Sequence, residues 1–427
     1  MTVAASLGNA SVGVRTTPRI YDQFYALALI YLWALQFIRG DSVELVSMDI
    51  GEYLFVIPAA ALALVSAAYV VMTTVRLRRS SIVAALFLLI VVAVSLQRGD
   101  RQTIASLGLL IITIIGILEI RPAISISLIN TLFFLSIPIN SLLYYFDYSI
   151  YTFIPGIGQH PDFWWRISLF PSAAEGGLFA MVVFLANLAL RGQKGRLGVL
   201  LVAAYFVVFA GNRTAIFAAV IGGIFIALRN NGRLTTSKSR AWFAIAAATA
   251  FLFSIFSSNL LLILPFADNS VLRLLIFREE AVGSFDVGDQ VGTAAIRQWI
   301  FQQHWAAFRQ SPLTGIGTFD FRMLTSGYGV LDDSVTGSEA FVTALLARVG
   351  LISLFFFGAI FLFRHTSEPR ESDLSLCAKL ALLIGMITYG SFVNAYDVVF
   401  ILLMLAIAGT IYVPVTGFSS ADTARRV

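Results

Sequence analysis

The sequence predicts an all-α polytopic membrane protein, and two observations carry this prediction. Of the 427 residues, 58% are hydrophobic and only 12% are charged, whereas soluble globular proteins carry about 25% charged residues. Long apolar runs also recur from one end of the chain to the other, and a run of about 18 or more residues is typical of a membrane-spanning helix. We therefore interpret residues 1–427 as a single integral membrane domain.

About twelve transmembrane helices are predicted, with a large, partly helical periplasmic loop between helices 9 and 10. The apolar runs that form them lie at residues 21–38, 53–75, 81–97, 102–120, 122–145, 173–190, 197–211, 214–229, 241–265, 340–363, 375–394 and 397–414. The large loop covers residues 266–338, and a structureless loop of that length is improbable in a compact domain. Thr293–Gln310 is therefore predicted to be its main helix, with Pro312 following its end.

The lysines and arginines of the loops predict the orientation. If the N-terminus is cytoplasmic, most of the loop arginines and every lysine fall on the cytoplasmic side, as the positive-inside rule requires. The even number of spans then makes both termini cytoplasmic, in a bacterial inner membrane. The basic residues of the other side are all arginines, and half of them lie in the large loop.

The sequence lacks the signals of a metal site, of a nucleotide-binding loop, of a disulfide and of nucleic-acid binding. No histidine and cysteine cluster has the spacing of a metal site, and no phosphate-binding Gly-Lys-Ser/Thr loop is present. Cys377 is the only cysteine, so an intrachain disulfide is impossible. The net charge of +5 is spread over short loops, which does not indicate nucleic-acid binding. We expect membrane lipids as partners, no nucleic acid and no cofactor.

Three residues near the large loop and the membrane surface are candidates for chemistry. Arg213 lies in a very short turn between two apolar runs, where it either binds a ligand or simply snorkels to the membrane surface. Arg297 and His304 are seven positions apart on the predicted loop helix and therefore share a face. Phe301 and Phe308 lie on that face too, so a packing role is the alternative.

Two further candidates lie around the start of the apolar run at 340–363. Glu339 stands directly before this run, where a carboxylate either stabilises the helix dipole or acts as a general base. Arg348 lies inside the run, and an ionised residue within a span by default indicates a functional or pairing site.

The order of these features resembles the O-antigen ligase and Wzy-type polysaccharide polymerase family of integral-membrane glycosyltransferases. The resemblance covers about residues 160–352. The matching stretches are Arg166 with Phe170-Pro171-Ser172, Asn212-Arg213-Thr214, Arg297 with Trp305, Pro312-Leu313-Thr314-Gly315-Ile316-Gly317, and Glu339-Ala340-Phe341 leading to Val349-Gly350-Leu351. No single stretch is specific, but their order and spacing together are.

The resemblance implies a metal-independent enzyme that takes glycan from an undecaprenyl-pyrophosphate-linked oligosaccharide at the periplasmic face. Arginines would hold the pyrophosphate, and the candidates are Arg166, Arg213, Arg297 and Arg348. Ligases of this family use a histidine where this chain has Ser338, with Glu339 beside it. This difference favours a polymerase, with Glu339 or His304 as the catalytic base, and possible partners are a chain-length regulator and a flippase.

Two alternatives remain open. One is a ligase that transfers glycan to a lipid or protein acceptor. The other is a glycolipid transporter or flippase without chemistry, for which discontinuous helices and two related halves are typical. The sequence contains no such halves, and the long outside loop favours an enzyme.

Overall fold

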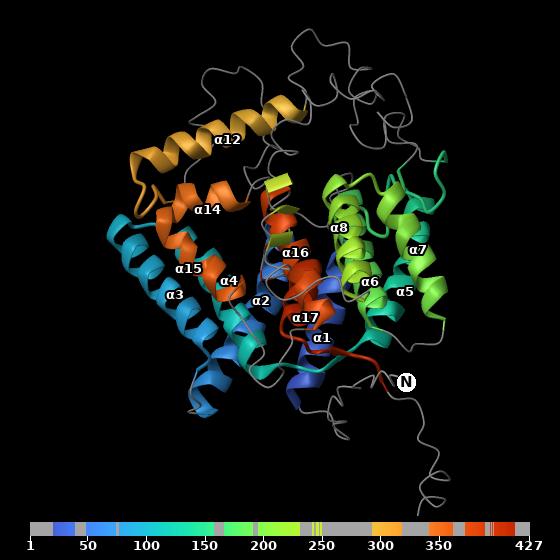
Figure 1. The fold of residues 1–427 in the computed structure, drawn as a ribbon, viewed down its shortest axis with the longest axis horizontal. Helices are drawn as coiled ribbons and strands as arrows, with labels where there is room; N and C mark the ends of the chain where they lie inside the picture. The colour runs from blue at the N-terminus through green and yellow to red at the C-terminus, as the bar shows by residue number, and fades with distance from the viewer. Residues whose placement is uncertain are drawn as a thin grey trace, which may run out of the picture.

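A computed structural model describes most of the chain, and it is mostly helical (Figure 1). The described residues are 20–38, 48–73, 77–157, 166–190, 195–230, 241–242, 245–246, 248–249, 293–317, 341–361, 372–388, 393, 395 and 397–414. Most of the predicted span at 241–265 and all of Glu339 lie outside these residues. The side chains of Arg213 and Arg297 lie outside them too, although their backbones are described.

The helices follow the predicted apolar runs closely. Those before residue 231 are α1 (Ile20–Leu35), α2 (Met48–Thr73), α3 (Arg79–Arg98), α4 (Arg101–Ile120), α5 (Ile126–Tyr145), α6 (Ala173–Ala189), α7 (Arg196–Phe209) and α8 (Arg213–Asn230). Those after residue 292 are α12 (Thr293–Gln310), α14 (Phe341–Val349), the 3-10 turn η2 (Gly350–Ile352), α15 (Ser353–Phe361), α16 (Asp373–Thr388) and α17 (Val398–Ile407). The helix predicted at Thr293–Gln310 is confirmed with the same bounds.

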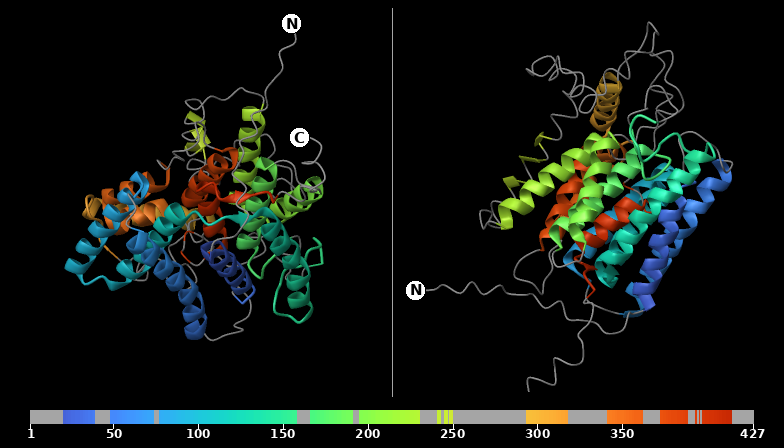
Figure 2. Two further views of the ribbon diagram at one scale, coloured as in Figure 1. Left: turned by 90° about the horizontal axis from the view of Figure 1, so that it is seen from below. Right: turned by 90° about the vertical axis from the view of Figure 1, so that its right-hand side faces the viewer.

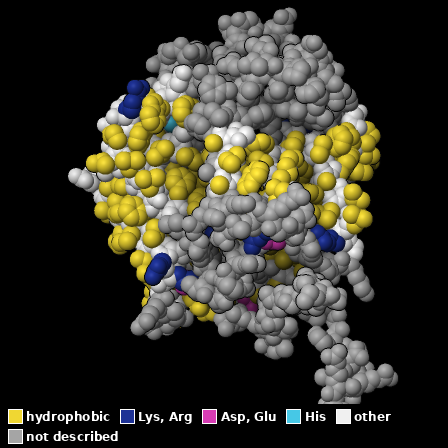
Figure 3. All heavy atoms as spheres, viewed as in Figure 1, with side chains coloured by type: hydrophobic (Ala, Val, Ile, Leu, Met, Phe, Trp, Pro, Cys, Tyr) yellow, Lys and Arg dark blue, Asp and Glu magenta, His cyan; other side chains and the backbone are white. Residues whose placement is uncertain are grey.

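Several of these helices suit a membrane by length and composition. Within the described residues, four stretches are long and apolar enough to cross one: Arg79–Arg98, Arg101–Ile120, Ile126–Tyr145 and Phe341–Phe361. Shorter apolar helices of 10 to 17 residues accompany them. Hydrophobic side chains form a broad band on the surface, and lysines and arginines gather mainly along its lower border (Figure 3). A mostly helical membrane protein is the class that these features define.

The bundle has two distinct ends. Helix α12 lies across one end, above the tips of the other helices in both side views (Figures 1 and 2). At the opposite end, β1 (Ile124–Ser125) pairs in parallel with β2 (Ile411–Tyr412). We call these the α12 end and the β-ladder end. Helices α3, α5, α7 and α16 run toward the α12 end, whereas α4, α6, α8 and α17 run away from it.

Helix α17 is the centre of the bundle. Every residue from Val398 to Ala408 is at most 2% exposed, and the helix packs against α1, α4, α6 and α16. Asp397 begins it as an N-cap, with its carboxylate accepting from the backbone N–H groups of Val399 and Phe400. The prediction of one span at 397–414 is wrong in length, because the helix ends at Ile407 and the chain then turns into β2.

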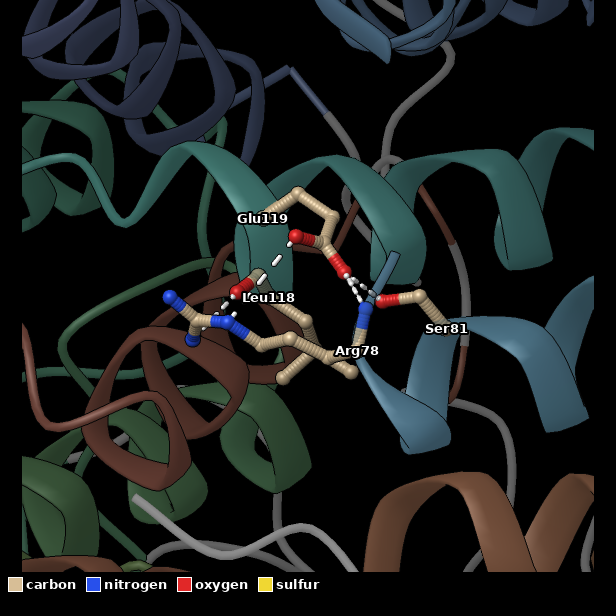
Figure 4. A network of polar contacts seen from close by, with 4 residues as sticks. All are labelled: Arg78, Ser81, Leu118 and Glu119. Atoms are coloured by element: carbon tan, nitrogen blue, oxygen red, sulfur yellow. Dashed lines mark hydrogen bonds and ion pairs between the residues drawn. The ribbon is translucent and has the colours of Figure 1, made fainter. Parts of the chain in front are cut away.

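Two arginines at the β-ladder end, Arg78 and Arg229, contact neighbouring helices through hydrogen bonds or an ion pair. Glu119 of α4 accepts a hydrogen bond from the backbone N–H of Arg78 (2.9 Å) and one from the Ser81 hydroxyl, while Arg78 Nη1 donates to the carbonyl of Leu118 (3.0 Å) (Figure 4). Because Glu119 supplies an acceptor for the first turn of α3, it fixes this helix against α4. Arg229 likewise forms an ion pair with Asp373 that joins α8 to α16.

The apolar run predicted as one span at 340–363 is interrupted in the structure. Helix α14 ends at Val349, η2 follows, and α15 continues in a different direction (Figure 1). The break occurs at Gly350, whose φ of +64° lies in the left-handed region that side chains other than glycine rarely adopt. A Cβ at this position would also lie 2.5 Å from the carbonyl oxygens of Pro312 and Leu313. The predicted apolar stretch is therefore present with nearly the predicted bounds, but as a helix broken at Gly350.

Candidate functional site

The candidate residues that the structure describes lie at the α12 end, in two groups. The first group surrounds the start of α6, and the second surrounds the segment that follows α12. Helix α16 stands between them, because Thr388 at its tip bonds to Thr214 of α8 (2.7 Å) and the same helix packs against α14. Figure 1 shows this order from α14 through α16 to α8.

The first group is built on the segment that leads into α6. Residue Ile167 forms a parallel bridge with Thr152 and donates its N–H to the carbonyl of Phe209 (3.1 Å). Ser168 adds hydrogen bonds on both sides, to the carbonyls of Thr152 (from its N–H, 3.1 Å) and Ser172 (from its hydroxyl, 3.0 Å). Arg166 precedes this anchored stretch and is 5% exposed. Its guanidinium is therefore held inside the junction rather than on the outer surface, and a phosphate would have to enter the junction to reach it.

The turn that contains Arg213 is anchored on both sides of the arginine. Asn212 caps α8: its Oδ1 accepts from the N–H of Ala215 (3.2 Å), and its Nδ2 donates to the carbonyl of Ala174 in α6 (2.8 Å). Thr214 bonds to Thr388 of α16. Because both neighbours are fixed, the backbone of Arg213 is fixed where α6, α8 and α16 meet. The direction of its side chain lies outside the described part, so ligand binding and snorkelling both stay open as interpretations of Arg213.

A buried carboxylic acid lies in the same junction and was not predicted. Glu175 occupies the first turn of α6 and is 5% exposed. It is the only charged residue within the predicted span at 173–190. This isolation within an apolar run is the signal that the sequence offered, since a charged residue inside a span is costly and usually serves a purpose.

The second group begins with His304, which lies between α12 and α14. The side chain is 0% exposed, and its Nδ1 is 2.8 Å from the hydroxyl oxygen of Thr343 in α14. Burial lowers the pKa of His304 to about 4 from the ordinary 6.5, so the imidazole is neutral at pH 7. A neutral, enclosed imidazole that bonds to a neighbouring helix suits a packing role, which was the alternative interpretation of this face.

The segment at residues 311–317, which we call the hook, binds the broken helix through its backbone. Ile316 and Gly317 donate to the carbonyls of Ala347 (2.8 Å) and Arg348 (3.0 Å), and Leu351 donates back to Pro312 (2.8 Å). Gly315 has a φ of +66°, and a Cβ on it would collide with the backbone of Arg348. The glycines of the predicted motif therefore permit close contact between two backbones, and the carbonyls left open by the break are satisfied.

Arg98, at the end of α3, clamps the hook from the other side. Its Nη1 donates to the carbonyl of Thr314 (3.1 Å) and its Nη2 to the hydroxyl of the same residue (2.6 Å). Asp100, the N-cap of α4, attracts Arg348 electrostatically. Sequence reasoning did not select Arg98, because an arginine at the end of an apolar run is ordinary and its partner is 216 positions away.

The structure thus distributes the predicted residues rather than gathering all of them. Arg166 and the backbone of Arg213 belong to the first group. His304, Arg348 and the helix that carries Arg297 belong to the second, and Glu339 lies outside the described residues. Within the described part, no group of three or more histidine, cysteine, aspartate or glutamate residues could hold a metal ion.

Comparison with known proteins does not assign the chain to a family. No protein-family model matches it, and no curated protein matches it.

Proposed function

We propose that the chain is a membrane glycosyltransferase that polymerises lipid-linked polysaccharide repeat units. The glycan would come from an undecaprenyl-pyrophosphate carrier and pass to an acceptor sugar at the membrane face on which α12 lies. The observation that carries the proposal is the arrangement of arginines at that end: Arg166 is buried just ahead of α6, Arg213 lies in the anchored turn before α8, and Arg348 lies in the last turn of α14, against the hook.

The chemistry of such a transfer suits these residues. A departing diphosphate develops negative charge, which fixed arginines stabilise electrostatically, and the planar guanidinium binds phosphate oxygens in pairs. The acceptor hydroxyl needs a base, which can contribute roughly 10²–10⁴-fold. Glu339 is the proposed base because it stands directly before the apolar run at 340–363 in the sequence, and His304 is the second candidate. No metal or cofactor is required by this scheme.

The proposal includes a topology of twelve spans in a bacterial inner membrane. Both termini would be cytoplasmic, and residues 266–338 would form a periplasmic loop. A chain-length regulator and a flippase that delivers the repeat units are the proposed partners. A ligase acting on a lipid or protein acceptor is the alternative within the same chemistry.

One observation favours a different class, a glycolipid transporter. The apolar stretch Phe341–Phe361 is discontinuous at Gly350, and discontinuous helices are common where transporters bind substrate. Here, however, the break is filled by the backbone of the hook, which leaves fewer free backbone groups for a substrate than an open break would.

The glycan profile of a deletion strain separates these functions. Loss of a polymerase leaves single repeat units on the lipid carrier in the periplasmic leaflet. Loss of a ligase leaves long chains that are not attached to an acceptor. Loss of a transporter leaves single units that a glycosidase added to the periplasm cannot reach. The proposal fails if the second or third pattern is found.

A further inference from the structure

Residues 146–157, which we call the lip, extend from α5 along the flank of the bundle at the α12 end. In Figures 1 and 2 this segment is the green-blue trace beyond the tip of α5 and beside α7. Two tyrosine hydroxyls attach it to these helices: Tyr205 donates to the carbonyl of Phe153 (2.8 Å), and Tyr144 donates to that of Ile157 (2.7 Å). The lip is therefore a fixed part of the bundle rim.

The lip presents apolar side chains outward. Phe146, Tyr148, Phe153, Ile154 and Ile157 are between 41% and 57% exposed. Asp147 is the only charged residue of the lip, and the sequence contains neither lysine nor arginine between Arg121 and Arg166. A segment that faced water on this side would expose a contiguous apolar patch, which is rare in soluble surfaces.

The Asp147 side chain is exposed at the start of the lip, whereas polar groups of residues 149–154 are satisfied locally. The Thr152 hydroxyl donates to the carbonyl of Ile154 (2.8 Å) and accepts from the N–H of the same residue (2.8 Å). Asn140 of α5 donates to the carbonyl of Tyr151 (3.1 Å), and the Ser149 hydroxyl oxygen accepts from the N–H of Tyr151 (3.2 Å). Such internal pairing is needed where water is scarce, because unpaired backbone groups are costly in a lipid environment.

The lip also continues a lipid-facing surface. Helix α5 is one of the stretches suited to crossing a membrane, and Leu135, Leu142 and Tyr145 are exposed along it up to the start of the lip. Tyrosines at the end of a span are typical of the boundary between headgroups and acyl chains. We propose that the lip is inserted into this boundary of the bilayer leaflet at the α12 end and binds bilayer lipid. This placement holds whether or not the protein transfers glycan.

The lone cysteine makes a direct test possible. Cys377 is fully buried, so a cysteine introduced at the surface can be labelled selectively with an environment-sensitive nitrobenzoxadiazole dye. The test variants are Phe153→Cys and Ile157→Cys, reconstituted in vesicles of phosphatidylethanolamine and phosphatidylglycerol. Leu89→Cys, exposed within α3, is the lipid-facing control, and Gln302→Cys, exposed on α12, is the aqueous control. The labelled wild-type protein measures the background from Cys377.

The proposal expects both lip variants to emit at the shorter wavelength of Leu89→Cys. It also expects stronger quenching by lipids carrying a nitroxide near the headgroup than by lipids carrying it deep in the acyl chain, with little quenching by iodide. Emission and iodide quenching like those of Gln302→Cys at both positions would overturn it. A short-wavelength emission that disappears as the ratio of lipid to protein is raised would identify a second copy of the chain as the occupant and overturn it too.

Discussion

Among the candidate arginines, Arg213 has a backbone that is anchored on both sides, by Asn212 and Thr214. We expect Arg213→Lys to lower polymerisation nearly as much as Arg213→Ala, on the order of 10²-fold, because an ammonium group cannot reproduce the planar fork. Both variants should accumulate normally, since Asn212 and Thr214 continue to anchor the turn. The measurement is the chain-length distribution of the glycan at matched protein level.

Arg101→Ala is the matched control for this prediction, because Arg101 is an exposed arginine at the start of α4, at the same end of the molecule. It should leave the glycan unchanged. Full polymerisation by Arg213→Ala would reduce Arg213 to a topology signal.

Two variants test whether Glu339 or His304 is the catalytic base. Glu339→Gln keeps the size and hydrogen bonding of the side chain but cannot take a proton, so we expect it to abolish chain growth in purified protein supplied with lipid-linked repeats. His304→Ala should reduce the rate only partly, because His304 is enclosed against Thr343 and acts through packing. A dead His304→Ala beside an active Glu339→Gln would reverse these roles.

At the scale of elements, the hook determines how α12 is held. Arg98→Ala removes both donors to Thr314, and because Arg98 is exposed to solvent, the two hydrogen bonds together contribute only about 1–2 kcal/mol. We therefore expect amide hydrogens of residues 293–317 to exchange roughly 10-fold faster, with those of α4 unaffected. Hydrogen-exchange mass spectrometry measures this directly.

Two variants sharpen the test of the hook. Arg98→Lys retains one donor and should restore part of the protection, while Arg101→Ala should change nothing. Unchanged exchange in Arg98→Ala would mean that the backbone contacts of the hook with α14 suffice to hold α12.

The contact between α12 and α14 should also depend on pH. Burial lowers the pKa of His304 to about 4 from 6.5, so the detached state binds the proton more readily than the docked state. The packing of α12 against α14 is therefore most stable above about pH 6.5. Its free energy weakens as the pH falls toward 4, by at most about 3 kcal/mol. Exchange of residues 301–310, corrected for the intrinsic rate at each pH, should speed up between pH 7 and pH 5.

His304→Gln is the control for the pH effect, because glutamine bonds to a hydroxyl but does not titrate in this range. The variant should show the same corrected exchange at both values. An equal pH effect in this variant would assign the titration to another group.

At the scale of the whole molecule, the orientation is open to a direct test. A reporter that is active only in the periplasm should work when fused within residues 281–289 and fail within residues 230–238. The expectation rests on the asymmetry of lysine and arginine between the loops. The opposite pattern would place α12 in the cytoplasm and remove the basis of the proposed function.

The sequence predicted the helices better than their interruptions. Apolar runs and flanking breakers identified α3, α4 and α6 within a few residues, and the pattern of Thr293–Gln310 identified α12 with its exact bounds. The break at Gly350 was not predictable, because a single glycine in an apolar run is tolerated in a helix. Its cause is the backbone of Pro312 and Leu313, which only the folded chain brings there.

The sequence pointed to some of the residues in the two groups at the α12 end and missed others. Arg213 was selected from its place in a short turn between two apolar runs and Arg166 from the resemblance, and the structure places them near the starts of α8 and α6, which pack together. Arg98 was missed because its role depends on a distant partner, and Glu175 because a carboxylate near a helix start is expected for the dipole alone.

The central position of α17 has a consequence for how the protein is made. The ribosome synthesises this helix after every other described helix, yet α1, α4, α6 and α16 all pack around it. The inner faces of these earlier helices therefore stay uncovered until α17 is made. β1 likewise stays unpaired until β2 is made. A nascent chain stopped before residue 398 lacks the helix that these four helices surround, so we expect the bundle to close only after α17 has been made.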